Sequence, residues 1–400
     1  MTSCTVIPDI PFMHYKEADK VGLGRRANTD NAAMNREPAF IVSVACGTNV
    51  PKAHCTKAEQ VANQSLAYLS ETLLLKRPIR IFMQYASFCG DRRRPGTANT
   101  VAGGEWYRDD DDCVLGPRSG LGSASPGAQM SFDKEFAVEM GLDWEYAYPV
   151  GIARQYVSDD ATLPFYDIRM RLNSDVDWYM DDQLARTGGS AQDRDGRFFD
   201  FAQIFIHETI HGIGFLTSWD DWMPGLLLPG RLASGTSSKT GARIITGLQP
   251  SSIYDKYLRD QVTGEWMDTY ADAIRNGAKE MSEKLQTPDI TLWMEEFAKT
   301  EAAALARLLY STVAVTPNAV VMWPPASDRG FVIHTPSSFD RGSSFSHLDD
   351  EVYFGLRDYV MRSSGVANVL VKEYRPSDRR YGVVGEAAIE VLRSIGLATR

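Results

Sequence analysis

The sequence predicts an α+β fold. A twisted mixed sheet and two helices are expected before Gly214, and a more irregular, helix-rich half after it, with a cleft between the two. Three stretches carry this prediction. Apolar and charged residues alternate in IRMRL (168–172), which is strand periodicity. FAQIFIHETIHGIGF (201–215) is a largely apolar helical stretch that a glycine can end. TLWMEEFAKTEAAALARLLY (291–310) is rich in strong helix formers.

The composition is that of a globular protein with a sizeable core. Hydrophobic residues make up 44% of the 400 residues and charged residues 24%, which allows one large domain or two ordinary ones. The net charge of -10 argues against nucleic acid and anionic membranes as main partners. We expect no membrane span, because no apolar run approaches the ~20 residues needed to cross a bilayer.

The N-terminal third holds all five cysteines. Bridges Cys46–Cys55 and Cys89–Cys113 would leave Cys4 odd, and five reduced thiols are the alternative. Residues 1–37 are polar without periodicity, so we expect an N-terminal arm or pro-segment there. The first twenty residues show no basic stretch followed by an apolar one, hence no visible secretory signal. The protein would then be cytosolic, or secreted with its leader missing from this chain.

The remaining elements follow in chain order. We expect a strand at 39–44, then a helix that Thr56 and Glu59 cap and Pro78 stops, then a second strand at 79–88. Asp109–Asp112 lie in a long polar region and are expected to form a solvated loop, with a calcium site as the alternative. The small residues of 120–130 predict a loop. Further helices are expected at 266–285 and 291–310, and a short strand at 320–323.

The helical stretch 201–215 contains the pattern H-E-x-x-H. His207 and His211 are four residues apart, so both imidazoles lie on one helix face and can bind one zinc ion. Glu208 can take a proton from a zinc-activated water. Asp200 is a good N-cap, with Gln203 as a capping-box partner. The alternative is a buried helix with two core histidines.

A catalytic zinc site needs a third protein ligand. The extended motif would place a histidine three residues after Gly214, but that position holds Thr217. We favour His347 as the third ligand, with neighbouring acids as residues that orient its imidazole. The other candidate ligands are His334, Asp349 and Glu351, and the candidate orienting residues are Asp349, Asp350 and Glu351.

The sequence also resembles a known family. HETIHGIGF, followed much later by SHLDDE and by Val360-Met361, resembles the leishmanolysin-like branch of the metzincin zinc metallopeptidases. The resemblance implies a metzincin-like zincin fold. In it, His207, His211 and His347 bind zinc, Glu208 is the general base and Met361 lies beneath the metal.

The resemblance also implies a division of the chain. An N-terminal catalytic subdomain would cover 38–214 and end in the zinc helix, and 215–346 would be an inserted segment. A C-terminal subdomain, 347–400, would hold the third ligand, the methionine turn and a final helix in GEAAIEVLRSIGL. The strand at 168–172 would lie along the cleft and bind the substrate backbone.

We therefore expect a zinc-dependent metalloendopeptidase that acts on proteins or peptides. The resemblance and the cysteines favour an extracellular location. Two alternatives stay open: a zinc-binding protein without catalysis, and a zinc hydrolase of a non-peptide amide or ester.

Overall fold

The computed structural model describes residues 12–15, 38–88, 120–157, 163–180, 183–185, 198–238, 240–355, 358–371 and 381–399. Within these ranges the chain is a mixed α+β protein, as predicted, but its strands form several small sheets and not a single one. Three predictions lie wholly or largely outside the described residues: the N-terminal arm 1–37, of which only 12–15 are described, the bridge Cys89–Cys113 and the acidic loop Asp109–Asp112.

The described α-helices are α1 (Lys52–Thr72), α2 (Lys134–Met140), α3 (Val150–Ala153), α4 (Phe201–Ile213), α5 (Met267–Leu285), α6 (Ile290–Phe297), α7 (Glu301–Leu309) and α8 (Glu386–Ser394). Shorter helical segments are η3 (Ile253–Tyr257), η4 (Tyr310–Ala314) and η5 (Tyr359–Met361). The strands are β1 (Phe12–Tyr15), β2 (Phe40–Cys46), β3 (Ile79–Ala86), β4 (Gly122–Pro126), β5 (Gln129–Phe132), β6 (Tyr148–Pro149), β7 (Ile168–Asn173), β8 (Trp178–Met180), β9 (Gln183–Ala185), β10 (Phe199–Asp200), β11 (Asp220–Met223), β12 (Leu226–Leu228), β13 (Leu232–Thr236), β14 (Arg243–Leu248), β15 (Leu258–Asp260), β16 (Val320–Met322) and β17 (Phe331–Ile333).

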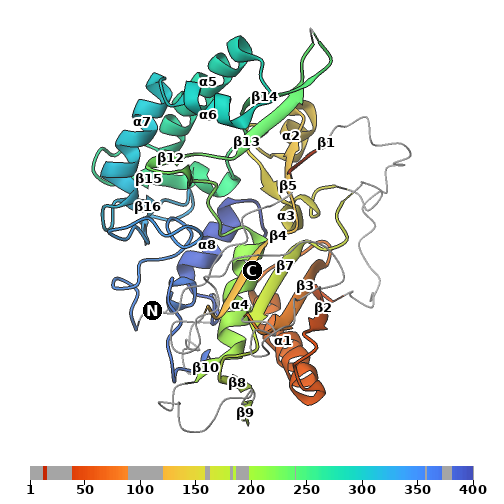
Figure 1. Cartoon of the computed structure of the whole chain (residues 1–400). Helices are drawn as coiled ribbons and strands as arrows, with labels where there is room; N and C mark the ends of the chain where they lie inside the picture. Colours follow the sequence, from red (N-terminus) through yellow and green to blue (C-terminus); the bar gives the residue numbers. More distant parts are fainter. Residues whose placement is uncertain are drawn as a thin grey trace, which may run out of the picture.

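The largest sheet has the order β2-β3-β7-β4. β2, β3 and β7 run parallel, and β4 is antiparallel to β7. The strands expected at 39–44, 79–88 and 168–172 are confirmed as β2, β3 and β7. Helix α4 packs on β4 and β7 and also contacts α1 (Figure 1). The sheet and α1 together hold α4 in place.

The predicted loop at 120–130 is wrong, because this stretch forms β4 and the start of β5. The small residues have a different cause. A Cβ at Gly122 would lie 2.7 Å from Leu172 Cδ2, and one at Gly127 would lie 2.3 Å from the carbonyl oxygen of Tyr166. Glycine is therefore needed where backbone and side chains approach closely.

The strand at 168–172, which was expected to bind the substrate backbone, lies inside the sheet and not at its edge. β7 pairs with β3 on one side and with β4 on the other, so it offers no free edge. β4, which the sequence did not predict, is the end strand of this sheet next to α4 among the described strands.

Two helix predictions need correction. The first helix begins at Lys52 after Pro51, so Thr56 lies inside the helix and does not cap it, and the helix ends at Thr72, before Pro78. Pro51 is the N-cap residue, with a φ of -57° and a ψ of 138°, and its side chain makes no capping hydrogen bond. The helix expected at 291–310 is two helices, because the Thr300 side chain accepts a hydrogen bond from Ala303 N at 3.1 Å and caps a new one.

The second half of the chain is rich in helices. α5 packs against β14, α6 and α7, and these elements lie at the opposite end of the molecule from α1 and the main sheet (Figure 1). α5, β16 and α8 confirm the helix at 266–285, the strand near 320–323 and the final helix. The domain limits at 214 and 346 stay a prediction.

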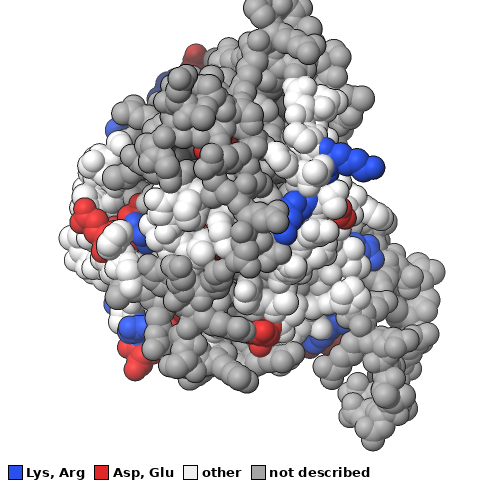
Figure 2. All heavy atoms as spheres, turned by 90° about the horizontal axis from the view of Figure 1, so that it is seen from below, with Lys and Arg blue, Asp and Glu red and all other residues white. Residues whose placement is uncertain are grey.

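Three surface and covalent features complete the fold. Cys46 and Cys55 form a disulfide between the end of β2 and the first turn of α1, as predicted. Among the described helices, none has the length and apolar character to cross a membrane. On the face drawn in Figure 2, the described basic and acidic side chains are dispersed, with both signs mixed.

Candidate metal centre

Helix α4 carries the H-E-x-x-H pattern. It begins where the Asp200 side chain accepts a hydrogen bond from Ala202 N at 2.9 Å, which confirms the predicted N-cap. It ends at Gly214, whose φ of 148° is costly for other residues. Every residue from Gln203 to Ile213 is buried.

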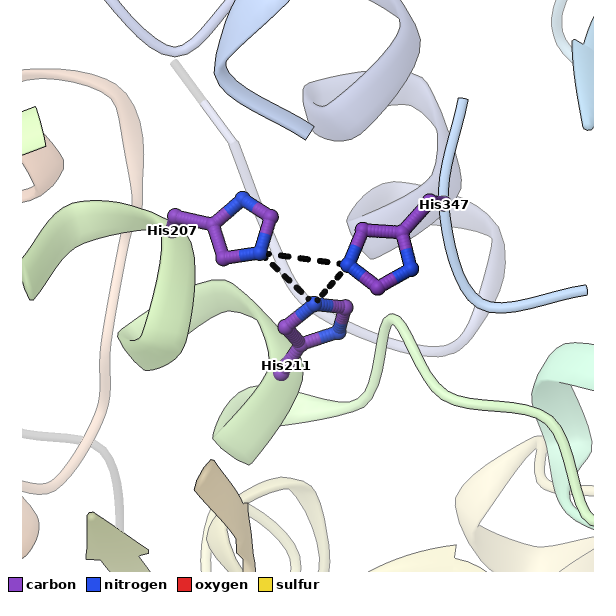
Figure 3. Close-up of side chains that lie close together, drawn as sticks. All are labelled: His207, His211 and His347. Carbon is purple, nitrogen blue, oxygen red and sulfur yellow. Dashed lines mark hydrogen bonds between the residues drawn. The ribbon is translucent and has the colours of Figure 1, made fainter. Parts of the chain in front are cut away.

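Three imidazoles converge above this helix (Figure 3). His207 Nε2 and His347 Nε2 each lie 3.0 Å from His211 Nε2, and they lie 3.3 Å from each other. All three side chains are at most 2% exposed. The structure therefore brings together His207, His211 and His347, which come from positions up to 140 residues apart.

The second nitrogen of each ring contacts a main-chain carbonyl. His207 Nδ1 lies 2.5 Å from the oxygen of Val360, and His211 Nδ1 lies 2.8 Å from that of Phe215. His347 Nδ1 lies 2.8 Å from the oxygen of Ser343. A carbonyl only accepts, so each Nδ1 carries the proton and each Nε2 has a lone pair.

This arrangement fits a metal ion. Three lone pairs cannot hydrogen bond with one another, and at 3.0–3.3 Å they repel. A cation between them removes the repulsion. Four-coordinate zinc with Zn–N distances of about 2.0–2.1 Å places its nitrogens roughly 3.3 Å apart, close to the separations found here. The donor set of three neutral imidazoles is also one that zinc accepts.

Burial keeps the three imidazoles neutral. It lowers the pKa of His207 to about 4, and it lowers the pKa values of His211 and His347 well below their usual range. The neighbouring histidines add to the effect on the latter two, since charging one ring disfavours charging the next. A neutral ring is the form that binds a metal.

The other candidate ligands lie outside the cluster. Asp349 accepts hydrogen bonds from Glu351 N and Val352 N and so caps a turn, and Glu351 is exposed. His334 donates its main-chain N–H to the oxygen of His347 at 2.8 Å, but its ring is not part of the cluster that could hold a metal ion.

The expected role of the neighbouring acids is wrong. The His347 ring is oriented by the carbonyl of Ser343, not by a carboxylate. Asp350 instead accepts hydrogen bonds from Ser363 and from the hydroxyl of Ser364 at 2.9 and 2.7 Å, and holds the chain after η5. Main-chain carbonyls carry no residue signature, so the sequence could not indicate them.

Glu208 lies between the helix and the end strand of the sheet. Its side chain is fully buried, and a Cβ added to Gly122 would meet its Oε1 at 3.0 Å. Only a strand with a glycine at this point leaves room for the carboxyl group. The metal-binding cluster found among the described residues consists of the three histidines and does not include Glu208.

The segment expected to form a methionine turn passes close to α4. η5 contacts α4, and Val360, within η5, supplies the carbonyl for His207. Met361 is fully buried, and its own carbonyl accepts a hydrogen bond from Leu348 N at 2.8 Å. That bond joins η5, which contacts His207, to Leu348, the residue after His347. The segments that hold the first and third histidines are therefore connected.

Comparison with known proteins places the chain in a family. It belongs to the SPBPB7E8-like family, whose model matches residues 17–233, including α4 but not His347. It is similar to "Uncharacterized protein PB7E8.01" of Schizosaccharomyces pombe, with 23% identity over 324 residues. The match covers 71% of this chain and 52% of the relative, so the chain spans about half the relative's length. No solved structure matches.

Proposed function

We propose that this protein is a zinc-dependent metalloendopeptidase with a metzincin-like catalytic fold. The observation that carries the proposal is the trio of buried Nε2 atoms within 3.3 Å of one another, next to a buried glutamate on the same helix. Three histidines and a separate carboxylate are the parts that zinc hydrolases use.

Each side chain has a role in this proposal. His207, His211 and His347 hold the metal, and their Nδ1–H bonds fix the ring planes. A zinc ion held by these residues would supply Lewis-acid chemistry, by lowering the pKa of a water molecule and polarising the scissile carbonyl. Glu208 accepts the proton of the attacking water and passes it to the departing amine.

The proposed substrate is a polypeptide. β4 ends the sheet next to Glu208, and an extended peptide aligned with an end strand presents its backbone regularly along it. The four side chains of the centre are at most 2% exposed. The Cys46–Cys55 disulfide favours an oxidising, extracellular location.

The test is Glu208→Gln, which keeps the shape of the side chain and removes the base. We expect one zinc per chain in wild type and variant, and a loss of peptide hydrolysis of about 100-fold or more in the variant. Glu351→Gln is the control, because Glu351 is exposed and outside the cluster, and it should behave like wild type.

Three results would contradict the proposal. Near-normal hydrolysis by Glu208→Gln with zinc bound would remove Glu208 from the mechanism. Turnover of esters but of no peptide would favour a non-peptide hydrolase. Zinc binding without turnover of any protein, peptide or ester would favour a zinc-binding protein without catalysis.

A further inference from the structure

His347 reaches the centre from far along the chain. It lies 136 positions after His211, and the segment between them contains β11 to β17 and α5 to α7. The helix fixes His207 and His211 relative to each other, but it does nothing for His347. Another part of the chain must hold the imidazole of His347 next to the two histidines of α4.

The exit of α4 is tied to η3. The carbonyl of Phe215 accepts a hydrogen bond from His211, and two residues later Thr217 donates from Oγ1 to Asp255 Oδ1 at 2.5 Å. Ser218 N donates to Asp255 Oδ2 at 2.9 Å, and the Ser218 hydroxyl donates to the same oxygen. The Asp255 carboxylate is buried and so binds both residues after the helix in one geometry.

The approach to His347 is tied to the same short helix. Tyr254, next to Asp255, donates its hydroxyl to the carbonyl of Phe345 at 2.9 Å. Phe345 has a φ of 65°, a left-handed conformation that costs energy for a residue with a side chain. It lies two residues before His347, so the strained turn sets the direction in which the histidine enters the centre.

A third contact joins the two sides directly. Thr217 N donates to the hydroxyl of Ser346 at 3.2 Å. Tyr254 also packs its ring against Phe215, with ring centres 5.1 Å apart. The helix exit, η3 and the turn before His347 are therefore joined in one hydrogen-bonded cluster.

We propose that Tyr254 and Asp255 are positioning residues that bring His347 into the metal centre. Asp255 holds the chain that leaves α4, and Tyr254 holds the strained turn before the third ligand. Thr217 stands where the extended zinc motif has its third histidine, and here its hydroxyl anchors the residues that place the distant one. This inference rests on the proposed function, and it explains how the metal centre of the proposed enzyme is assembled.

The experiment compares Tyr254→Phe with Tyr257→Phe. Each substitution removes one hydroxyl and keeps the ring. Tyr257 belongs to the same η3 and donates to the carbonyl of Ser394 at 2.8 Å, away from the histidines, so it is a matched control. Zinc affinity is measured by competition with a chromogenic chelator, the visible spectrum of the Co²⁺-substituted protein reports the ligand geometry, and urea unfolding reports stability.

We expect Tyr254→Phe to bind zinc about 10-fold more weakly, as contacts behind a ligand commonly do when lost, and to show an altered Co²⁺ spectrum. Tyr257→Phe should keep wild-type zinc affinity and spectrum even if it unfolds at lower urea. Thr217→Val, which removes the hydroxyl that binds Asp255, should weaken zinc binding in the same direction as Tyr254→Phe.

The outcomes separate this inference from the proposed function. Equal zinc affinity and equal spectra in Tyr254→Phe and Tyr257→Phe, with a wild type that binds zinc, would overturn the positioning role and leave the peptidase proposal standing. A folded wild type that binds no zinc would overturn both. Loss of activity in Glu208→Gln does not depend on Tyr254 and tests the function alone.

Discussion

The two halves of the metal centre differ in how their geometry arises. α4 supplies His207 and His211 from adjacent turns, and helical periodicity alone puts the two rings together. His347 comes from an irregular segment, and its ring is held by the hydrogen bond that Nδ1 donates to the carbonyl of Ser343 and by the contacts of η3. A local motif therefore defines part of the candidate metal site, whereas the position of the last histidine depends on the whole fold.

Replacing the distant ligand is the strongest test of this comparison. His347→Ala leaves both helix ligands in place, and we expect zinc affinity to fall by roughly 100-fold or more, because a lost ligand costs more than a lost outer contact. Zinc content by elemental analysis after dialysis measures the effect.

His334→Ala is the control, since His334 pairs with the His347 main chain but its ring is outside the cluster. It should retain one zinc per chain. If His347→Ala keeps its zinc, α4 is sufficient alone, and the contrast between the two halves disappears.

The sequence could predict what depends on local periodicity. The strands β2, β3 and β7, the helix α4 and its cap at Asp200 all follow from the local sequence, and for β7 from the alternation of apolar and charged residues. β4 was missed because its small residues resemble a loop, and only the approach of Leu172 and Glu208 to Gly122 explains them.

The third ligand was favoured from its residue type, but its position could not follow from spacing. Val360, Phe215 and Ser343 orient the rings through carbonyl groups that every residue has. Tyr254 and Asp255 gave no signal, because a tyrosine and an aspartate become positioning residues only through partners that lie far away in the sequence. Long-range contacts, not propensity, decide this half of the centre.

The next test weakens the packing of α4, the helix that supplies His207 and His211. Gly212 follows His211 on α4, and a Cβ there would lie 2.2 Å from Ile168 Cγ2 on β7. Gly212→Ala should therefore lower the free energy of unfolding by about 1–3 kcal/mol, since the close packing of helix on sheet leaves no room. Urea unfolding measures the change.

Gly151→Ala is the matched control, because Gly151 is also helical and a Cβ there would meet Asp167 Cβ at an ordinary 3.5 Å. It should be neutral or slightly stabilising. A Gly212→Ala protein as stable as Gly151→Ala would mean that α4 is not held by close contact with β7.

The smallest expected effect is the pH dependence of stability that comes from the carboxylate of Asp255 in η3. Burial raises the pKa of Asp255 from 3.8 to about 6, against the opposing hydrogen bonds from Ser218 and Thr217. Between these two values the folded protein binds more protons at this site than the unfolded chain, so this group makes stability fall as the pH rises.

Asp255→Asn lacks this titration. With metal removed by a chelator, the free energy of unfolding of wild type relative to Asp255→Asn should therefore drop by about 1 kcal/mol between pH 5 and pH 7. Urea unfolding at both pH values measures this difference. A pH-independent difference would show that the carboxylate is solvated, and then η3 would not provide the dry, rigid anchor that sets the third ligand apart from the helix pair.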